Sequence, residues 1–162
     1  MLHHKVRLTN ESGFTLIEIL VVVGISAVLF VLGSINLGNT QSTTSVTSAM
    51  DTLLANIKSQ QLLAMSGDEG SQSSQQPHGV YLQNTSYTLF AGSTYNSSDT
   101  NNFTVNIAPD TITTTFPNST LLFEVGDGAI PDFNSSDDTI TITGVAKTQT
   151  ITLDRFGATS VQ

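Results

Sequence analysis

One stretch constrains this chain more than any other: a nearly unbroken apolar run from Phe14 to Ile35. The run covers 22 residues, and Glu18 is its only charged residue. As an α-helix it would rise about 33 Å, at roughly 1.5 Å per residue, which is enough to cross a bilayer core about 30 Å thick. A helix buried in a soluble core would show a polar face, and this run shows none. The sequence therefore predicts a membrane-spanning helix.

A short polar leader, residues 1–13, precedes the run. It carries Lys5 and Arg7 against a single acid, Glu11, and positive charge on that side predicts a cytoplasmic N-terminus. A secretory signal peptide is cut after its apolar segment, at a site of small residues, and no such site clearly follows here. A cut after Gly13 would instead remove only the leader and leave the helix in the mature chain.

Glu18 lies inside the apolar run and needs an explanation. An ionised carboxylate within a bilayer costs about 2.5–3.5 kcal/mol on insertion scales. In one reading, Glu18 lies near the interface or is protonated. In the other, it awaits an opposite charge: a cut after Gly13 would free the amine of Phe14, and the amine of one subunit would neutralise Glu18 of its neighbour in a helical stack.

The segment Gly13-Phe14-Thr15-Leu16-Ile17-Glu18, followed by apolar residues, resembles the class III signal of bacterial type IV pilins and type II secretion pseudopilins. The resemblance implies that a prepilin peptidase, a membrane aspartyl protease, cuts after Gly13 and methylates Phe14. It also implies that Glu18 directs the docking of subunits. Further partners would be other pilin or pseudopilin subunits and an inner-membrane assembly platform.

The same resemblance implies a structural role in a filament, either a type IV pilus (a fimbrium) or a pseudopilus of the type II secretion system. The subunit would be inserted once in the cytoplasmic membrane with its N-terminus inside, and would then join an extracytoplasmic filament. The competing hypothesis is an uncut signal anchor that tethers an extracellular β-domain, which binds a partner without forming filaments. A secreted hydrolase would need cleavage after the apolar run.

Residues 33–45 are rich in glycine, serine, threonine and asparagine. Gly33 and Gly38 each cost a helix about 1 kcal/mol relative to alanine. The composition predicts a break, which is either a plain loop or a soft joint in a long helix. The resemblance implies a joint that melts when subunits pack into a filament.

Helical periodicity returns after this stretch. Steps of four, three and four residues place Val46, Met50, Leu53 and Ile57 on one stripe, which predicts an amphipathic helix packed across a sheet. Further apolar residues follow at Leu62, Leu63 and Met65, whereas Lys58, Gln60 and Gln61 lie off the stripe. Gly67 and the polar residues after it end the helix.

From residue 79 onward the pattern becomes β. Short alternating segments separated by turn residues predict antiparallel strands, the first two joined as a hairpin; the segments are 79–82, 87–91, 103–107, 112–116, 121–125, 139–143, 150–153 and 158–161. We therefore predict an α+β, pilin-like fold: a long N-terminal α-helix, with an apolar membrane-spanning half and an amphipathic half, and a C-terminal antiparallel β-sheet domain. The order of elements over residues 46–162 also resembles the H-type minor pseudopilin and FimT-like branch of the family.

This organisation gives four segments. Residues 1–13 are the leader, residues 14–36 the transmembrane and filament-core helix, residues 37–66 the flexible joint and amphipathic helix, and residues 67–162 the globular β-domain.

Charge narrows the possible partners. Without the leader, Lys58, Lys147 and Arg155 stand against twelve acids, a net charge of −9. A nucleic-acid surface needs a basic patch, so the sequence argues against nucleic acid as a ligand. Cysteine is absent, so packing and strand pairing must stabilise the globular part without disulfides.

A turn-rich stretch contains four acids, Asp127, Asp132, Asp137 and Asp138. Clustered carboxylates on loops can bind calcium, although this spacing does not match an EF-hand loop. A solvated acidic loop and an acidic patch that faces a partner are the other two readings.

Catalysis receives little support from the sequence. There is no cysteine, no nucleophile motif of the G-x-S-x-G or S-x-x-K type and no glycine-rich phosphate loop. His78, the only histidine beyond the leader, has no partner at a recognisable spacing and is interpreted as an exposed loop residue. We expect no enzymatic activity, no catalytic residue, no metal site and no cofactor.

Overall fold

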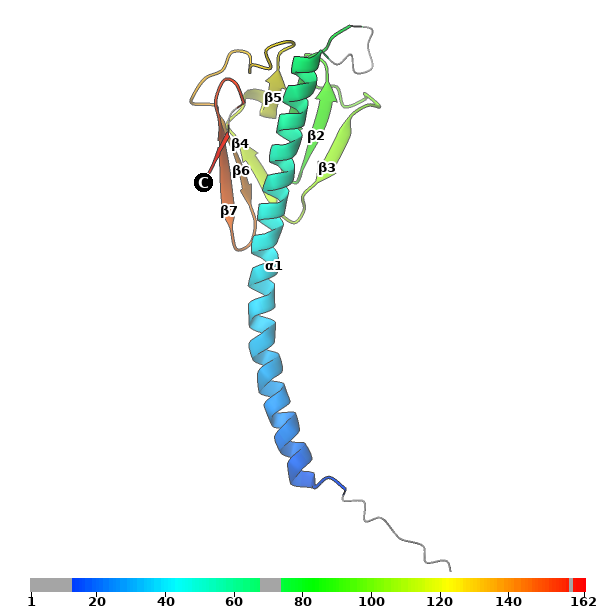
Figure 1. Cartoon of the computed structure of the whole chain (residues 1–162), viewed down its shortest axis with the longest axis vertical. Coiled ribbons are helices and arrows are strands. Elements are labelled where there is room, and N and C mark those ends of the chain that lie inside the picture. The colour runs from blue at the N-terminus through cyan, green and yellow to red at the C-terminus, as the bar shows by residue number, and fades with distance from the viewer. Residues whose placement is uncertain (1–12, 68–73, 158) are drawn as a thin grey trace, which may run out of the picture. The chain divides into compact units, whose positions relative to one another are not determined.

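The structure, a computed structural model, describes residues 13–67, 74–157 and 159–162, together with the side chains of these residues except 32–43 and 159. The chain divides into two compact units, with the boundary between Gly38 and Asn39. Helix α1 (Leu16–Ser66) crosses this boundary as one continuous element (Figure 1).

The backbone of residues 33–45 is helical, which corrects the expected break or loop. Two glycines cost a helix only about 2 kcal/mol together, and no proline interrupts the ladder of hydrogen bonds in this stretch. Extending a helix by one residue is also easier than nucleating a second helix. The flexibility of the joint and its melting in a filament stay predictions.

The second unit contains two four-stranded antiparallel sheets. The first has the order β3-β2-β1-β5, formed by β1 (His78–Leu82), β2 (Ser86–Ala91), β3 (Phe103–Asn106) and β5 (Thr120–Phe123). The second has the order β4-β6-β7-β8, formed by β4 (Thr111–Thr114), β6 (Thr139–Thr143), β7 (Thr148–Leu153) and β8 (Thr159–Val161). A short 3-10 helix, η1 (Pro117–Ser119), precedes β5.

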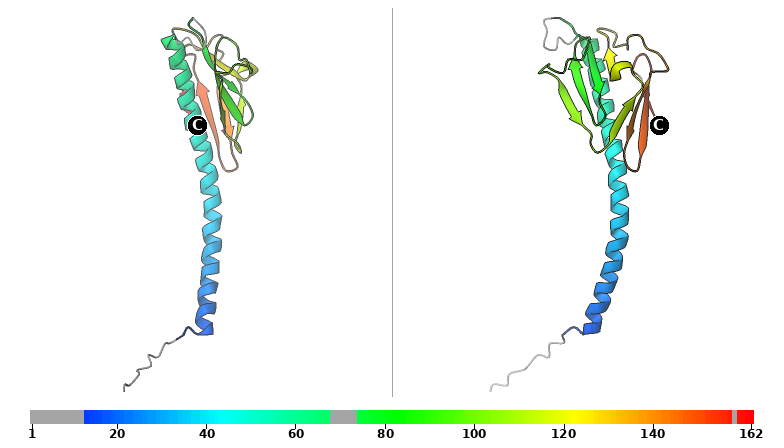
Figure 2. Two further views of the ribbon diagram at one scale, coloured as in Figure 1. Left: turned by 90° about the vertical axis from the view of Figure 1, so that its right-hand side faces the viewer. Right: turned by 180° about the vertical axis from the view of Figure 1, so that it is seen from behind.

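A backbone hydrogen bond joins the two sheets, since the N–H of Ile112 in β4 donates to the carbonyl of Asn84 in the β1–β2 turn over 2.7 Å. The sheets form one layer, and the part of α1 that belongs to this unit lies across one face of it (Figure 2). The predicted α+β fold, with a long N-terminal helix and an antiparallel β-domain, is confirmed, and every predicted strand overlaps an observed one.

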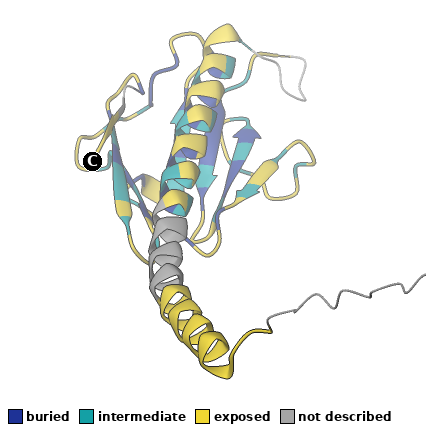
Figure 3. Ribbon diagram, turned by 60° about the horizontal axis from the view of Figure 1, so that its bottom comes forward, coloured by how far each residue is buried: buried dark blue, intermediate teal, exposed yellow. Residues whose placement is uncertain are grey.

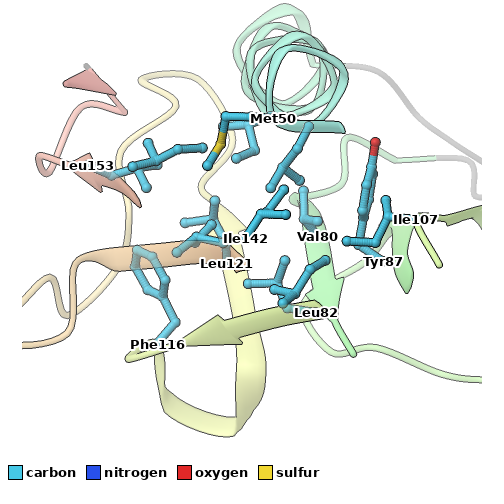
Figure 4. Packing of buried hydrophobic residues seen from close by; sticks show 14 of the residues in the cluster. Met50, Val80, Leu82, Tyr87, Ile107, Phe116, Leu121, Ile142 and Leu153 are labelled. Carbon is cyan, nitrogen blue, oxygen red and sulfur yellow. The ribbon is translucent and has the colours of Figure 1, made fainter. Parts of the chain in front are cut away.

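The core lies between α1 and the two sheets. Val46, Met50, Leu53 and Ile57 of α1 are each at most 1% exposed, as the predicted stripe requires. They face buried side chains from both sheets (Figure 4); among these are Val80, Leu82, Tyr87, Leu121, Phe123, Ile140, Ile142, Ile151 and Leu153. Burial of apolar surface from two sheets under one helix holds the unit together.

Near its C-terminal end, α1 buries different residues from those expected. Gln60 is only 6% exposed, whereas Leu62 is 65% and Met65 49% exposed. The helical phase explains the difference: steps of three and four from Ile57 arrive at Gln60 and Ala64. The stripe therefore continues through a glutamine and an alanine, and the nearby leucine points outward.

One polar contact crosses the core. The Asn56 side-chain amide in α1 donates a 2.8 Å hydrogen bond to the Tyr87 hydroxyl in β2. Burial raises the pKa of Tyr87 above its ordinary value, and the hydrogen bond from Asn56 lowers it by less.

The burial pattern of α1 predicts the effect of a matched pair of leucine variants. Leu53→Ala should lower the free energy of unfolding by about 2–5 kcal/mol, because it leaves a cavity in the core. Leu62→Ala, the same change at an exposed position of the same helix, should lower it by less than about 0.5 kcal/mol. Denaturant unfolding of the full chain in detergent measures both. Similar losses at the two positions would contradict the observed helical phase.

Tyr87 also predicts a dependence on alkaline pH. Because its pKa is raised in the fold, the folded state holds the phenolic proton more tightly than the unfolded state. The free energy of unfolding should thus fall as the pH rises above the ordinary tyrosine value of about 10. Tyr87→Phe should remove this part of the loss, and Asn56→Ala should enlarge it by removing the hydrogen bond that lowers the pKa. Denaturant unfolding at a series of pH values measures the effect, and an unchanged profile for Tyr87→Phe would refute it.

Candidate functional site

The bond between Gly13 and Phe14 is exposed. Both residues precede the first turn of α1, and Phe14 is 79% exposed. A Cβ placed on Gly13 would meet no atom within 4 Å. Within the described residues, this bond is therefore sterically open to a protease.

Thr15 begins the helix. Its hydroxyl oxygen accepts a 3.3 Å hydrogen bond from the backbone N–H of Glu18, and its carbonyl accepts bonds from the N–H groups of Glu18 and Ile19. This is the geometry of an N-cap residue. With Glu18 three residues later, the segment also has the sequence of a capping box. This role of Thr15 was not predicted from the sequence, although the T-x-x-E spacing in front of an apolar run was the signal for it.

Glu18 lies in the first turn of α1. The unpaired N–H groups of a helix N-terminus carry partial positive charge, and a carboxylate beside them is stabilised by about 0.3–1 kcal/mol. That is only a fraction of the about 2.5–3.5 kcal/mol needed to bring a carboxylate into a bilayer. The helix N-terminus would therefore offset only part of the free-energy cost of placing the Glu18 carboxylate in a bilayer. An opposite charge from a partner would offset more of it. The cut after Gly13, the methylation of Phe14 and the docking role of Glu18 stay predictions.

The N-terminal part of α1 exposes apolar side chains on all its sides. From residue 14 to residue 31 every side chain is exposed (Figure 3), and the large apolar ones are between 49% and 82% exposed. Residues 32–35 of the predicted membrane-spanning run lie outside the residues whose side chains are described. Among the described residues, the structure contains no helix that is both long enough and apolar enough to cross a membrane.

The four acids of the predicted cluster lie in different local surroundings. Asp132 and Asp137 line one hollow, and Asp138 lines another. Asp127 lies in a tight turn, where its carboxylate accepts a hydrogen bond from the N–H of Ala129 over 3.0 Å. Within the described ranges, no group of three or more His, Asp or Glu side chains is placed to hold a metal ion. The calcium and partner-patch readings stay predictions.

Two further polar groups lie apart from the motif. His78 is only 4% exposed, as the first residue of β1, where it lies between Ala91 of β2 and Phe123 of β5. This corrects its interpretation as an exposed loop residue: the strand begins one residue earlier than expected. Asp99 lies on an exposed loop, where hydrogen bonds from the backbone and side chain of Asn101 lower its pKa.

The cap at Thr15 makes a prediction that does not depend on filament assembly. Thr15→Ala removes the hydroxyl acceptor and should destabilise the first turn of α1 by about 1 kcal/mol. The amides of that turn should then exchange with solvent roughly fivefold faster. Thr15→Ser keeps the acceptor and is the matched control. Hydrogen exchange on the full chain in detergent measures the difference, and equal rates for the two variants would rule out the cap.

A comparison with protein-family models matches residues 8–34 to the prokaryotic N-terminal methylation motif. Searches of curated proteins and of solved structures found no match to this chain. The matched range contains Gly13, Phe14, Thr15 and Glu18 and the apolar helix that follows them. The chain therefore carries the N-terminal signal of type IV pilins and pseudopilins.

Proposed function

We propose that the chain is a structural subunit of a type IV pilus or a type II secretion pseudopilus. The observation that carries this proposal is that three structural features occur together within one motif. An open Gly13–Phe14 bond, a capped helix start with Glu18 in its first turn, and a helix that exposes apolar side chains all fall within the matched range, residues 8–34. The proposed role is structural, not catalytic.

The apolar surface of residues 14–31 supports assembly. Exposed apolar area of this extent on a protein indicates a membrane or another protein surface as its partner. In the precursor, the lipid bilayer would cover it, with the leader in the cytoplasm and the β-domain outside. In the filament, the same helices of neighbouring subunits would replace the lipid through packing.

Glu18 would set the register of that packing. Once the leader is removed, the amine of Phe14 lies four residues before Glu18, at the same end of the helix. An amine and a carboxylate from two neighbouring subunits would attract strongly in an apolar environment, where the effective dielectric constant is low. An uncompensated carboxylate there would oppose assembly.

The arrangement of the globular part favours the H-type minor pseudopilin and FimT-like branch as the closer assignment. The supporting observation is an amphipathic helix packed on two antiparallel sheets. The runner-up function remains a signal-anchored extracellular β-domain. It would keep its leader, and in it Glu18 would serve only the first turn of the anchor helix, without a partner charge from another subunit.

The N-terminus of the mature protein distinguishes these functions. Mass spectrometry on the membrane fraction and on filaments sheared from the cell surface should find a peptide that begins at Phe14 and carries one additional methyl group. Its presence in the sheared fraction would support assembly as well as processing. A chain that retains Met1 and occurs only in membranes would overturn the proposed function in favour of the anchored domain.

Glu18→Ala separates processing from assembly. Cleavage after Gly13 should continue, because the Gly13–Phe14 bond is exposed and unchanged. Incorporation into filaments should fall at least about tenfold, which corresponds to a loss of about 1.4 kcal/mol or more per docking event. Glu18→Asp, which keeps the charge, should retain more assembly than Glu18→Ala. The readout is the ratio of processed subunit in sheared and membrane fractions, and normal incorporation of Glu18→Ala would refute the docking role.

A further inference from the structure

Two hollows in the globular unit share one aromatic side chain in their linings. Phe133, on the loop between β5 and β6, lines both of them. Its side chain is half-buried and packs partly against the core, and it also contributes to the surface of both hollows. Neither hollow involves the N-terminal motif, so a ligand site at Phe133 would be independent of the proposed filament role.

The first hollow is lined by both apolar and polar side chains. It encloses about 300 Å³, which is at the small end of the usual range for small-molecule sites, about 300–1,000 Å³. Phe116, Leu122 and Phe133 supply apolar surface, and Thr120, Asn134 and Asp132 add hydroxyl, amide and carboxylate groups. Among the residues that the structure describes, no lysine, arginine or histidine lines it.

The second hollow is shallower and richer in hydroxyl groups. Ser135, Thr152 and Ser160 line it together with Phe133, and its lining also includes two carboxylates, Asp138 and Asp154. Thr152 and Ser160 belong to adjacent strands, β7 and β8. The hollow therefore opens onto the second sheet.

The outer face of that sheet continues the hydroxyl surface. Strand pairing aligns nine residues of this sheet in three rows, and none of the nine is buried. The rows are Thr111–Thr143–Thr148, Thr113–Thr141–Thr150 and Thr139–Thr152–Ser160. Their neighbours Ile140, Ile142 and Ile151 point to the opposite face, into the core. We call these nine residues the threonine face. Each of them carries a hydroxyl and none carries a charge, in a chain with a formal net charge of −8.

Some of these hydroxyls are already ordered. Thr141 and Thr150 share a 2.9 Å hydrogen bond between their hydroxyl oxygens across β6 and β7. A hydroxyl offers one donor and two acceptor sites, so each of these groups keeps hydrogen-bonding capacity for a ligand. Strands lie about 4.8 Å apart, and alternate residues of a strand lie about 6.6 Å apart. The face is therefore a regular array of hydroxyl and methyl groups.

We propose that the two hollows around Phe133, with the adjoining threonine face, bind a polysaccharide that carries no negative charge. A sugar ring has C–H groups on its faces and hydroxyls at its edges. The face of an aromatic ring attracts the C–H groups, and carboxylates, amides and threonine hydroxyls pair with the sugar hydroxyls. Asp132, Asp137 and Asp138 at the hollows repel uronic acids and nucleic-acid phosphates. The array lets several sugar units bind at once along the sheet.

The test uses the full chain in detergent and three neutral hexasaccharides as probes: cellohexaose, maltohexaose and N-acetylchitohexaose. Calorimetric titration should detect binding of at least one of them with a Kd below about 1 mM. Hexagalacturonate, the acidic counterpart, should not bind. Phe133→Leu keeps an apolar side chain against the core but removes the flat ring, and should weaken binding about tenfold or more. Phe156→Leu is the matched control, because Phe156 is 63% exposed and lines neither hollow.

A second variant guards against a purely structural effect of Phe133→Leu. The double variant Asp132→Asn/Asp137→Asn removes both carboxylates that line the first hollow and should strengthen the binding of hexagalacturonate, while circular dichroism shows an unchanged fold. Three outcomes would overturn the proposal: no neutral hexasaccharide binds, Phe133→Leu and Phe156→Leu bind equally well, or hexalysine binds at Phe133 in place of every sugar. The last result would identify the hollows as a docking site for a basic protein partner.

Discussion

The burial of α1 is the constraint on which the rest of the structure depends. The same helix meets two different requirements along its length. Residues 14–31 expose apolar side chains on every side, whereas the residues from Val46 to Ala64 bury a single stripe against two sheets. A one-sided stripe is satisfied within one chain. An apolar surface on all sides is not, and its extent is the reason to propose a membrane or neighbouring subunits as its surroundings.

Glu18 lies in the first turn of α1, at the N-terminal end of the exposed apolar segment. As part of a capped first turn, its carboxylate is stabilised by the partial positive charge of the helix N-terminus. That contribution is smaller than the cost of placing a charge in an apolar medium. The difference is the reason to propose a further partner charge, which the amine of Phe14 would supply if the leader were removed. The cap accounts for the place of Glu18 in the first turn, and the docking role of Glu18 stays a prediction.

The sequence was informative wherever a residue's polarity agreed with its position. Short apolar or alternating segments between turn residues located the strands of the described residues, and the stripe from Val46 to Ile57 located the buried face of α1. Prediction from the sequence was wrong where the position of a residue in its helix or strand, and not its polarity, determines whether it is buried. Gln60 is buried because it follows Ile57 by three residues on the helix, and His78 is buried because it opens the central strand β1. The hollows around Phe133 could not be predicted, since they bring together a loop and two sheet edges far apart in the sequence.

Gln61 of α1 helps to position the loop that carries Phe133. Its side-chain amide donates hydrogen bonds to the carbonyls of Gly128, over 3.0 Å, and Phe156, over 2.6 Å. Two loops are thereby fixed to the end of α1, and both approach it so closely that a Cβ on Gly128 or Gly157 would lie within 3.0 Å of atoms of Gln61 or Met65. Both glycines also have a positive φ, a backbone conformation that residues with a side chain rarely adopt. The first loop continues at once into Ile130 and Phe133, and Ile130 is held in turn by a hydrogen bond to the carbonyl of Arg155. The helix whose N-terminal part carries the pilin signal thus orders, at its C-terminal end, the loop on which the proposed polysaccharide surface is built.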